Sequence, residues 1–292
     1  MRSLLFVPGD DPRKISKALS GDADALIFDL EDSVSPARKA AAREISAAAV
    51  SAARQAGTAK RIILRINALA TGLADADLDA VMPARPDIIM LPKCATGADV
   101  QQLSVKLAVA EAQHGLPDGA TKIIPIATET AGALFGLGTY RGVSQRLAGL
   151  TWGAEDLSAD LGAVTNRDAA GQYTGPYRLA RDLTLAGASH AEVMPIDTIY
   201  ANFRDAAGFE AECRDAMRDG FTAKMAIHPA QVAVINQVFT PSPEAVARAR
   251  KIIDAFAADP SAGVIGIDGE MIDRPHVRRA ERLLARAKAA KL

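Results

Sequence analysis

Eight short apolar runs recur along the chain at roughly even spacing, and stretches with helical character separate them. The runs occupy residues 3–9, 25–32, 61–67, 87–93, 122–129, 147–153, 191–197 and 224–229. Near-continuous apolar runs of this length are typical of parallel strands that are buried on both faces. Eight such strands alternating with helices predict an α/β fold of the (β/α)8 kind, a TIM barrel.

The alternation stops near residue 238, and this divides the chain. We predict a catalytic barrel over residues 1–238 and a small extension over residues 239–292. The extension begins with a predicted helix after Pro241 and Pro243. An Asp-Gly turn between two apolar stretches then indicates a hairpin, and a last helix follows over about 275–290. Because so short a segment buries little core by itself, we predict an appendage and not an independent domain.

Composition and charge exclude several classes of protein. The chain has 292 residues, of which 49% are hydrophobic and 24% charged, with a net charge of −1. This balance argues against nucleic acid or an anionic membrane as the main partner. Cys94 and Cys213 have no metal-ligand spacing, so we predict free thiols in a reducing compartment. No run approaches the ~18 apolar residues of a membrane span or resembles a signal peptide, and we predict a soluble, cytoplasmic protein.

Charged residues gather at the C-terminal ends of the predicted strands. Barrel enzymes build their active sites at that end of the barrel. The residues in question are Asp29, Glu31, Asp32, Arg65, Lys93, Glu129 and Asp156.

Two of these carboxylates suggest a metal site. Glu129 ends the fifth run, and Asp156 lies three residues past the sixth. Mg2+ takes one or two protein carboxylates and leaves its other positions to water and substrate, so two neighbouring strand ends could share one ion. The residues alone are equally consistent with a structural role, in which these carboxylates cap the following helices or pair with a basic side chain.

Arg65 and the acids of the second run form another charged group. A guanidinium at a strand end can grip a carboxylate through two parallel hydrogen bonds, and the carboxylate could belong to a substrate. It could equally belong to Asp29 or Glu31, in a structural ion pair. Asp29, Glu31 and Asp32 resist ionising together, so a cation must lie nearby: a metal, Arg65 or Lys93.

Three other polar residues have a simple structural interpretation. His228, at the end of the eighth run, is predicted to be a loop histidine held by Pro229. Asp268 is predicted to be a turn residue, and Asp273 is predicted to cap the last helix just before Pro275.

Taken together, these segments resemble the citrate lyase beta-subunit-like family of the HpcH/HpaI aldolase superfamily. Relatives in it include malyl-CoA, citramalyl-CoA and hydroxymethylglutaryl-type lyases. The matching stretches span nearly the whole chain in the family's order. They are RSLLFVPGDDPRKISKAL, ALIFDLEDSVSPARKAAAR, LRIN, IIMLPK, IATETAGAL, WGAEDLSADLG, AIHPAQ and GEMIDRPH.

The resemblance implies specific roles for the residues at the strand ends. Arg65 is expected to hold the substrate carboxylate. Glu129 and Asp156 are expected to hold Mg2+, with Glu129 also touching the substrate. Asp29 and Glu31 would orient Arg65 and the water molecules on the metal.

The resemblance also implies a role for the extension. It would be a lid that carries a catalytic aspartate into the active site of a neighbouring subunit. Asp273 is the expected residue, with Asp268 as the fallback. Coenzyme A is expected near the barrel rim, with contacts from Lys17, Lys39, Ile227 and His228.

The implied activity is that of a Mg2+-dependent carbon–carbon lyase. It would cleave or form a 3-hydroxyacyl-CoA such as malyl-CoA or citramalyl-CoA, with an oxo acid and an acyl-CoA as the other side of the reaction. Four alternatives stay open: the citryl-ACP lyase subunit of citrate lyase, with an acyl carrier protein thioester; a malyl-CoA thioesterase; an aldolase acting on free hydroxy-oxo acids; and a barrel that only binds a ligand. The resemblance implies a homo-oligomer, a trimer or a hexamer of paired trimers.

Overall fold

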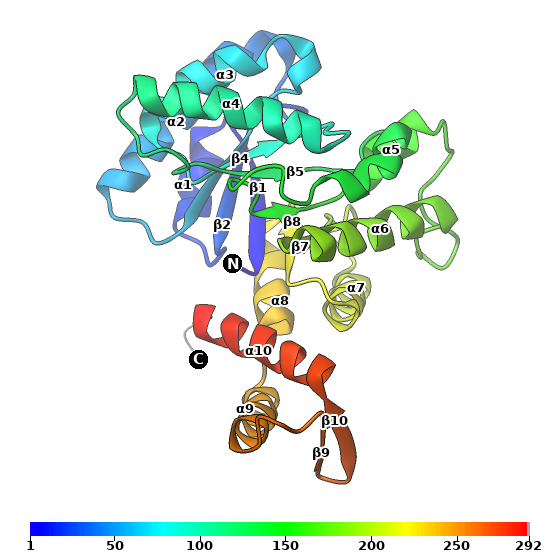
Figure 1. The fold of residues 1–292 in the computed structure, drawn as a ribbon. Helices are drawn as coiled ribbons and strands as arrows, with labels where there is room; N and C mark the ends of the chain where they lie inside the picture. Colours follow the sequence, from blue (N-terminus) through cyan, green and yellow to red (C-terminus); the bar gives the residue numbers. More distant parts are fainter. Residues whose placement is uncertain (291–292) are drawn as a thin grey trace. The chain divides into compact units, whose positions relative to one another are not determined.

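The computed structural model describes residues 1–290, and its larger part is a barrel of eight parallel strands (Figure 1). The hydrogen-bonded order is β5-β4-β3-β2-β1-β8-β7-β6. Two bridges, Ile123 to Leu147 and Ile126 to Thr151, join β5 to the residues around β6 and close the circle. The predicted TIM barrel is confirmed.

The strands are shorter than the apolar runs that predicted them. Their bounds are β1 Ser3–Pro8, β2 Ala25–Asp29, β3 Arg61–Arg65, β4 Ile88–Leu91, β5 Lys122–Pro125, β6 Gly149–Leu150, β7 Met194–Asp197 and β8 Ala223–Ala226. The last residues of several runs leave the sheet because they carry the polar side chains of the barrel end. Glu129, for example, lies four residues beyond β5.

Helices follow the strands and cover the outside of the barrel (Figure 1). They are α1 Pro12–Leu19, α2 Lys39–Gln55, α3 Ala74–Val81, α4 Gly97–Gln113, α5 Ala154–Asp160, α6 Gly175–Ala191, α7 Ala206–Asp219 and α8 Pro229–Phe239. Short 3-10 helices occupy η1 Pro36–Arg38, η2 Leu69–Thr71, η3 Met82–Ala84 and η4 Ala131–Thr139.

Helix starts follow local sequence chemistry. Asp11 caps α1 by accepting hydrogen bonds from the backbone N–H groups of Arg13 and Lys14, at 3.1 and 3.0 Å. Pro12 occupies the first turn, where its missing N–H is not needed. Thr96 and Asp99 form a reciprocal capping box at the start of α4. These caps fix where the chain turns from strand end to helix.

Strand register decides which side chains share the barrel interior. Asp29 on β2 lies beside Arg65 on β3, and Leu4 on β1 lies beside Met225 on β8. Since side chains alternate along a strand, Phe6 points to the same side as Leu4. The register therefore brings a charged pair and apolar side chains to the same end of the barrel.

A buried charge network ties β7 and β8 to the outer helices. Lys224 is fully buried, and its Nζ lies 2.8 Å from Asp197 Oδ2 and 2.9 Å from Glu212 Oε1. Asp197 also accepts a hydrogen bond from Trp152 Nε1 at 2.8 Å. Burial alone would raise the pKa of Asp197, but the charges of Lys224 and Arg181 outweigh it and lower that pKa.

We expect Lys224→Met to lower the free energy of unfolding by about 3 kcal/mol, because it leaves the Asp197 carboxylate buried without its main cation. Urea unfolding measures the change. Lys14→Met, at an ion pair whose lysine is 64% exposed, is the matched control and should leave the midpoint nearly unchanged. Equal midpoints for the two variants would contradict a stabilising role for the network.

The chain forms two compact units, Arg2–Asn236 and a second unit that begins at Gln237. The second unit contains α9 Pro243–Ala258, the antiparallel pair β9 Val264–Ile267 and β10 Glu270–Asp273, and α10 Arg274–Ala289. Asp268 and Gly269 both have positive φ, 52° and 81°, as a two-residue hairpin turn requires. The predicted hairpin is confirmed.

The second unit buries a small apolar cluster of its own. The cluster combines side chains from both helices and the hairpin: Ala249, Ile252, Phe256, Ile267, Ile272 and Ala280. The short length of the extension predicts little core of its own. The core forms because α9, the hairpin and α10 each contribute apolar side chains to it. Within residues 1–290, no helix is long and apolar enough to cross a membrane.

Candidate active site

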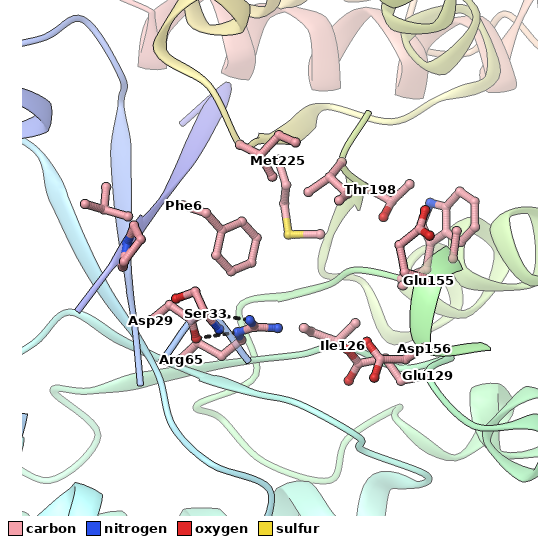
Figure 2. Close-up of a pocket in the computed structure, with 17 residues that line it drawn as sticks. Phe6, Asp29, Ser33, Arg65, Ile126, Glu129, Glu155, Asp156, Thr198 and Met225 are labelled. Carbon is pink, nitrogen blue, oxygen red and sulfur yellow. Dashed lines mark hydrogen bonds and ion pairs between the residues drawn. The ribbon is translucent and has the colours of Figure 1, made fainter. Parts of the chain in front are cut away.

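A pocket of about 260 Å³ opens at the C-terminal ends of the barrel strands (Figure 2). Its polar lining comes from the predicted site residues Asp29, Arg65, Glu129 and Asp156, together with Ser33, Glu155 and Thr198. Its apolar lining includes Phe6, Ile126, Trp152, Met225 and Ile227. The barrel therefore brings residues from seven separate segments of the sequence to one cavity.

Arg65 is held in place by two carboxylates. Its Nε and Nη2 each lie 2.7 Å from an oxygen of Asp29, and its Nη1 lies 2.9 Å from Glu31 Oε2. Burial alone would raise the pKa of Asp29, but the hydrogen bonds and charge of Arg65 outweigh it and hold that pKa below its ordinary value. The structural ion pair is thus present, and the guanidinium still lines the pocket, where it could also bind an anion.

Lys93 supplies the second cation that the acidic cluster requires. Its Nζ lies 2.7 Å from Glu31 Oε1, 3.1 Å from Asp156 Oδ1 and 3.5 Å from Asp32 Oδ2. Lys93 has a φ of 49°, a conformation that non-glycine residues seldom adopt. The turn after β4 is therefore arranged so that one ammonium group joins the acids of β2 to the segment after β6.

Glu129 is almost completely buried beside Asp156. It is 3% exposed, and its Oε2 accepts a hydrogen bond from the backbone N–H of Lys93. Burial, reinforced by the charges of Asp156 and Glu31, raises the pKa of Glu129 to about 8. A Cβ at Gly153 would lie 2.9 Å from Glu129 Cγ, so only glycine leaves room for this side chain.

These two carboxylates could hold a hard divalent cation. Figure 2 shows Glu129 and Asp156 next to each other on one side of the pocket. The Lys93 N–H bonds to Glu129 Oε2, and Glu129 lines the pocket, so its other oxygen is left for a cation there. Residues 1–290 contain no group of three or more His, Cys, Asp or Glu side chains that could enclose a metal. A set of two suits Mg2+, which completes its shell with water and substrate.

Of the four predicted coenzyme A contacts, Ile227 belongs to the pocket and His228 follows it directly in the chain. Ile227 lines the pocket and is 37% exposed. The ring of His228 stacks on Phe203, with centroids 4.9 Å apart, and its Nδ1 accepts a hydrogen bond from the N–H of Ala230. A loop position for His228 is confirmed.

The other two predicted contacts lie elsewhere. Lys39 Nζ donates to the carbonyl oxygens of Leu30 and Glu31, both at 2.7 Å, so its ammonium supports the loop after β2. Lys17 is exposed in the last turn of α1 and does not line the pocket. Any role in ligand binding stays a prediction for both.

Asp268 and Asp273 belong to the second unit. Asp268 is a turn residue paired with Lys251, and Asp273 stands at the N-cap of α10, as predicted. The hydrogen bond from His276 lowers the pKa of Asp273 below its ordinary value. A catalytic role for Asp273 stays a prediction.

Sequence reasoning did not single out the apolar lining or Gly153. Phe6 and Met225 could have been found from strand alternation, since both lie in apolar runs on the side that faces the barrel interior. Gly153 and Trp152 carry no such signal. Their positions depend on contacts with Glu129 and Asp197, which are distant in sequence.

Two protein-family models match this chain and show the class of protein to which it belongs. A family model described as a carbon–carbon bond lyase of the TIM-barrel fold matches residues 178–290. The model for HpcH/HpaI aldolase/citrate lyase matches residues 2–229, most of the chain. The chain belongs to the HpcH/HpaI aldolase/citrate lyase family, and it is an enzyme of the carbon–carbon lyase class.

Curated relatives cover the full length of the chain. The citrate lyase subunit beta of Leuconostoc mesenteroides subsp. cremoris is 33% identical, over 99% of this chain and 93% of its own. The mitochondrial citramalyl-CoA lyase of Rattus norvegicus is 32% identical, over 99% and 87%. A (3S)-malyl-CoA thioesterase of Cereibacter sphaeroides is 34% identical, over 99% and 95%. The names of these three relatives denote three different reactions.

A solved structure supports the same family. The protein CitE from Mycobacterium tuberculosis, in complex with magnesium, acetoacetate and coenzyme A, is 31% identical to this chain. The alignment covers 98% of each chain with a TM-score of 0.77.

Proposed function

We propose that this enzyme cleaves, or forms by Claisen condensation, a 3-hydroxyacyl-CoA such as malyl-CoA or citramalyl-CoA. The products of cleavage are an oxo acid and an acyl-CoA. The observation that carries the proposal is the meeting of Arg65 with Glu129 and Asp156 in one pocket at the C-terminal barrel end. The reaction needs those two elements, an anion grip and a metal site, next to each other.

Arg65 binds the carboxylate of the acid portion in this proposal. Asp29 and Glu31 fix its guanidinium on two edges, so it meets the substrate with little further loss of rotamer freedom. Phe6, with its ring 5.0 Å from Arg65 Cζ, closes one side and excludes water from the ion pair that forms.

Glu129 and Asp156 hold Mg2+ in this proposal. Two facts about this chain support that choice: the Lys93 N–H bonds to only one oxygen of Glu129, and both carboxylates line a cavity that can also take a substrate. When bound, Mg2+ would act as a Lewis acid on the oxygen that becomes the carbonyl of the oxo acid. Lys93 keeps Asp156 in position from the opposite side.

Coenzyme A binds beside Ile227, which lines the pocket, and His228, the next residue in the chain, in this proposal. The complex of the Mycobacterium tuberculosis relative with magnesium and coenzyme A supports both this carrier and the metal.

Asp273 supplies the proton-transfer group in this proposal. We expect Asp273→Asn to slow exchange of the α-protons of acetyl-CoA or propionyl-CoA by about 10²- to 10⁴-fold, the usual contribution of a positioned acid or base. Mg2+ affinity should not change. Deuterium uptake measured by mass spectrometry tests this. Asp268→Asn is the control, and loss of exchange in that variant alone would move the role to Asp268.

Asp273 acts in a neighbouring subunit of a homo-oligomer, a trimer, in the same proposal. Two inactive variants test the shared site: Glu129→Gln removes the metal ligand, and Asp273→Asn removes the proton carrier. Co-expressed in mixed oligomers, they should recover part of the activity, because some sites then combine two intact halves. No recovery in oligomers that contain both variants would place Asp273 in its own subunit's site.

Product analysis tests the reaction itself. The purified enzyme with Mg2+ and citramalyl-CoA or malyl-CoA should release pyruvate or glyoxylate with one acyl-CoA per oxo acid. Free citramalate or malate with CoA would indicate a thioesterase, the activity of the Cereibacter sphaeroides relative. Turnover of a carrier-protein thioester alone would favour the citrate lyase subunit, as the Leuconostoc relative is named.

A further inference from the structure

His276 lies directly against the carboxylate of Asp273. The two residues are one helical turn apart at the start of α10, and His276 Nδ1 is 2.5 Å from Asp273 Oδ1. The same nitrogen is 3.3 Å from the backbone N of Asp273. Both side chains are about one-third exposed, at 30% and 34%. One ring nitrogen thus faces two groups of the same residue.

These two contacts demand different proton positions. A backbone N–H can only donate, so it bonds to Nδ1 only when Nδ1 carries a lone pair. In that state the 2.5 Å contact requires the proton on the carboxyl group. With the proton on Nδ1 instead, the ring donates to a carboxylate and the backbone contact is lost. The geometry therefore suits one proton that passes between Oδ1 and Nδ1.

We propose that His276 is a positioning residue for Asp273 that also takes up and returns its proton during each turnover. This inference rests on the proposed role of Asp273 in proton transfer. It gives a function in proton transfer to His276, which has no role in the family resemblance or in the pocket of the barrel.

The proton balance is simple in the direction of enolisation. The α C–H bond of the acyl-CoA breaks, its electron pair enters the enolate, and the proton moves to Asp273 Oδ1. The carboxyl group passes that proton to the neutral ring at Nδ1. The resulting imidazolium releases its Nδ1 proton to water, which restores the neutral ring with its hydrogen on Nε2. Cleavage runs the same path in reverse, so Asp273 is reprotonated before the next enolate forms.

Other charged groups around the pair have partners of their own. Arg274 donates to the carbonyl oxygens of Pro260 and Ala262, at 2.8 and 3.3 Å. On the hairpin and α9, Arg248 pairs with Glu270 and Lys251 pairs with Asp268. Across the hairpin, Asp273 lies opposite Val264, which is apolar. The imidazole is thus the titratable group in contact with this carboxylate among the described residues.

The test is the pH profile of α-proton exchange. Imidazole changes charge between pH 5 and 8, and its neutral form is the one that accepts the proton. Wild-type exchange should therefore rise across that range. His276→Asn keeps a hydrogen-bonding side chain at the same distance but cannot titrate. The exchange rate of this variant should no longer rise with pH. At pH 8 it should be about tenfold lower than that of the wild type, a smaller loss than the 10²- to 10⁴-fold typical of a direct acid or base.

Two further measurements separate a proton role from a purely structural one. Added imidazole should restore part of the exchange in His276→Ala, which a capping role does not predict. The thermal midpoints of both variants show whether α10 is intact. An unchanged pH profile in His276→Asn, with no rescue of His276→Ala, would overturn the proposal. Normal α-proton exchange in Asp273→Asn would overturn the proposed role of Asp273. Slow exchange in Asp273→Asn with an unchanged pH profile in His276→Asn would overturn only the role of His276.

Discussion

Glu129→Gln is expected to abolish metal-dependent cleavage, with a loss of at least about a thousandfold in kcat/KM. Glutamine keeps the size and the hydrogen bond to the backbone of Lys93 but removes the charge that a divalent cation requires. Loss of Lewis-acid stabilisation is worth several kcal/mol, and ~4 kcal/mol corresponds to this factor. Calorimetric titration should show Mg2+ affinity falling in parallel.

The fold should survive this substitution. Burial raises the pKa of Glu129 to about 8, so without metal its carboxyl group is mostly neutral near pH 7, and the neutral glutamine changes little in the folded protein. The thermal midpoint should stay the same or rise. Glu192→Gln, in an exposed ion pair with Arg141, is the control and should keep full activity. Full activity in Glu129→Gln would remove this residue from the metal site.

Arg65→Met is expected to have the other large effect, on both activity and stability. It removes the anion grip, and it leaves Asp29 and Glu31 buried without their shared cation. Breaking a buried ion pair in this way costs about 3–5 kcal/mol of unfolding free energy. Turnover should fall below detection even at temperatures where the variant is folded, and circular dichroism alongside the product assay separates the two effects.

Arg65→Lys separates charge from geometry. Lysine restores the positive charge but cannot make the paired contact with both oxygens of Asp29. We expect most of the stability to return, while KM for the acyl-CoA substrate stays raised by at least about tenfold, the value of one charge-assisted hydrogen bond. A lysine variant with wild-type KM would show that the guanidinium does not bind the substrate.

Much of the barrel could be predicted from sequence because its strands are buried on both faces. Each strand is an apolar run, and polar residues follow directly at the active end. Asp29 and Arg65 illustrate this: each is the last residue of its strand, so the register that pairs β2 with β3 also pairs their charges. The local sequence pattern and the known geometry of a parallel barrel are therefore sufficient to predict this ion pair.

Contacts between distant segments could not be predicted in the same way. The oxygen of Glu129 meets the backbone of Lys93, which depends on the turn geometry at one positive-φ residue. The resemblance implies a coenzyme A contact for Lys39, and nothing in the sequence indicated that its ammonium also donates to two carbonyl groups. Charge and position identify candidates, but the partner of a flexible side chain is decided by three-dimensional packing.

The most direct test of the proposed site is a crystal structure with Mn2+ in place of Mg2+ and with pyruvate or glyoxylate bound. Anomalous scattering would locate the metal without ambiguity. We expect one Mn2+ ion bound by Glu129 and Asp156, with the carboxylate of the oxo acid within hydrogen-bonding distance of Arg65. A metal bound elsewhere, or an oxo acid that does not contact Arg65, would contradict the proposed site.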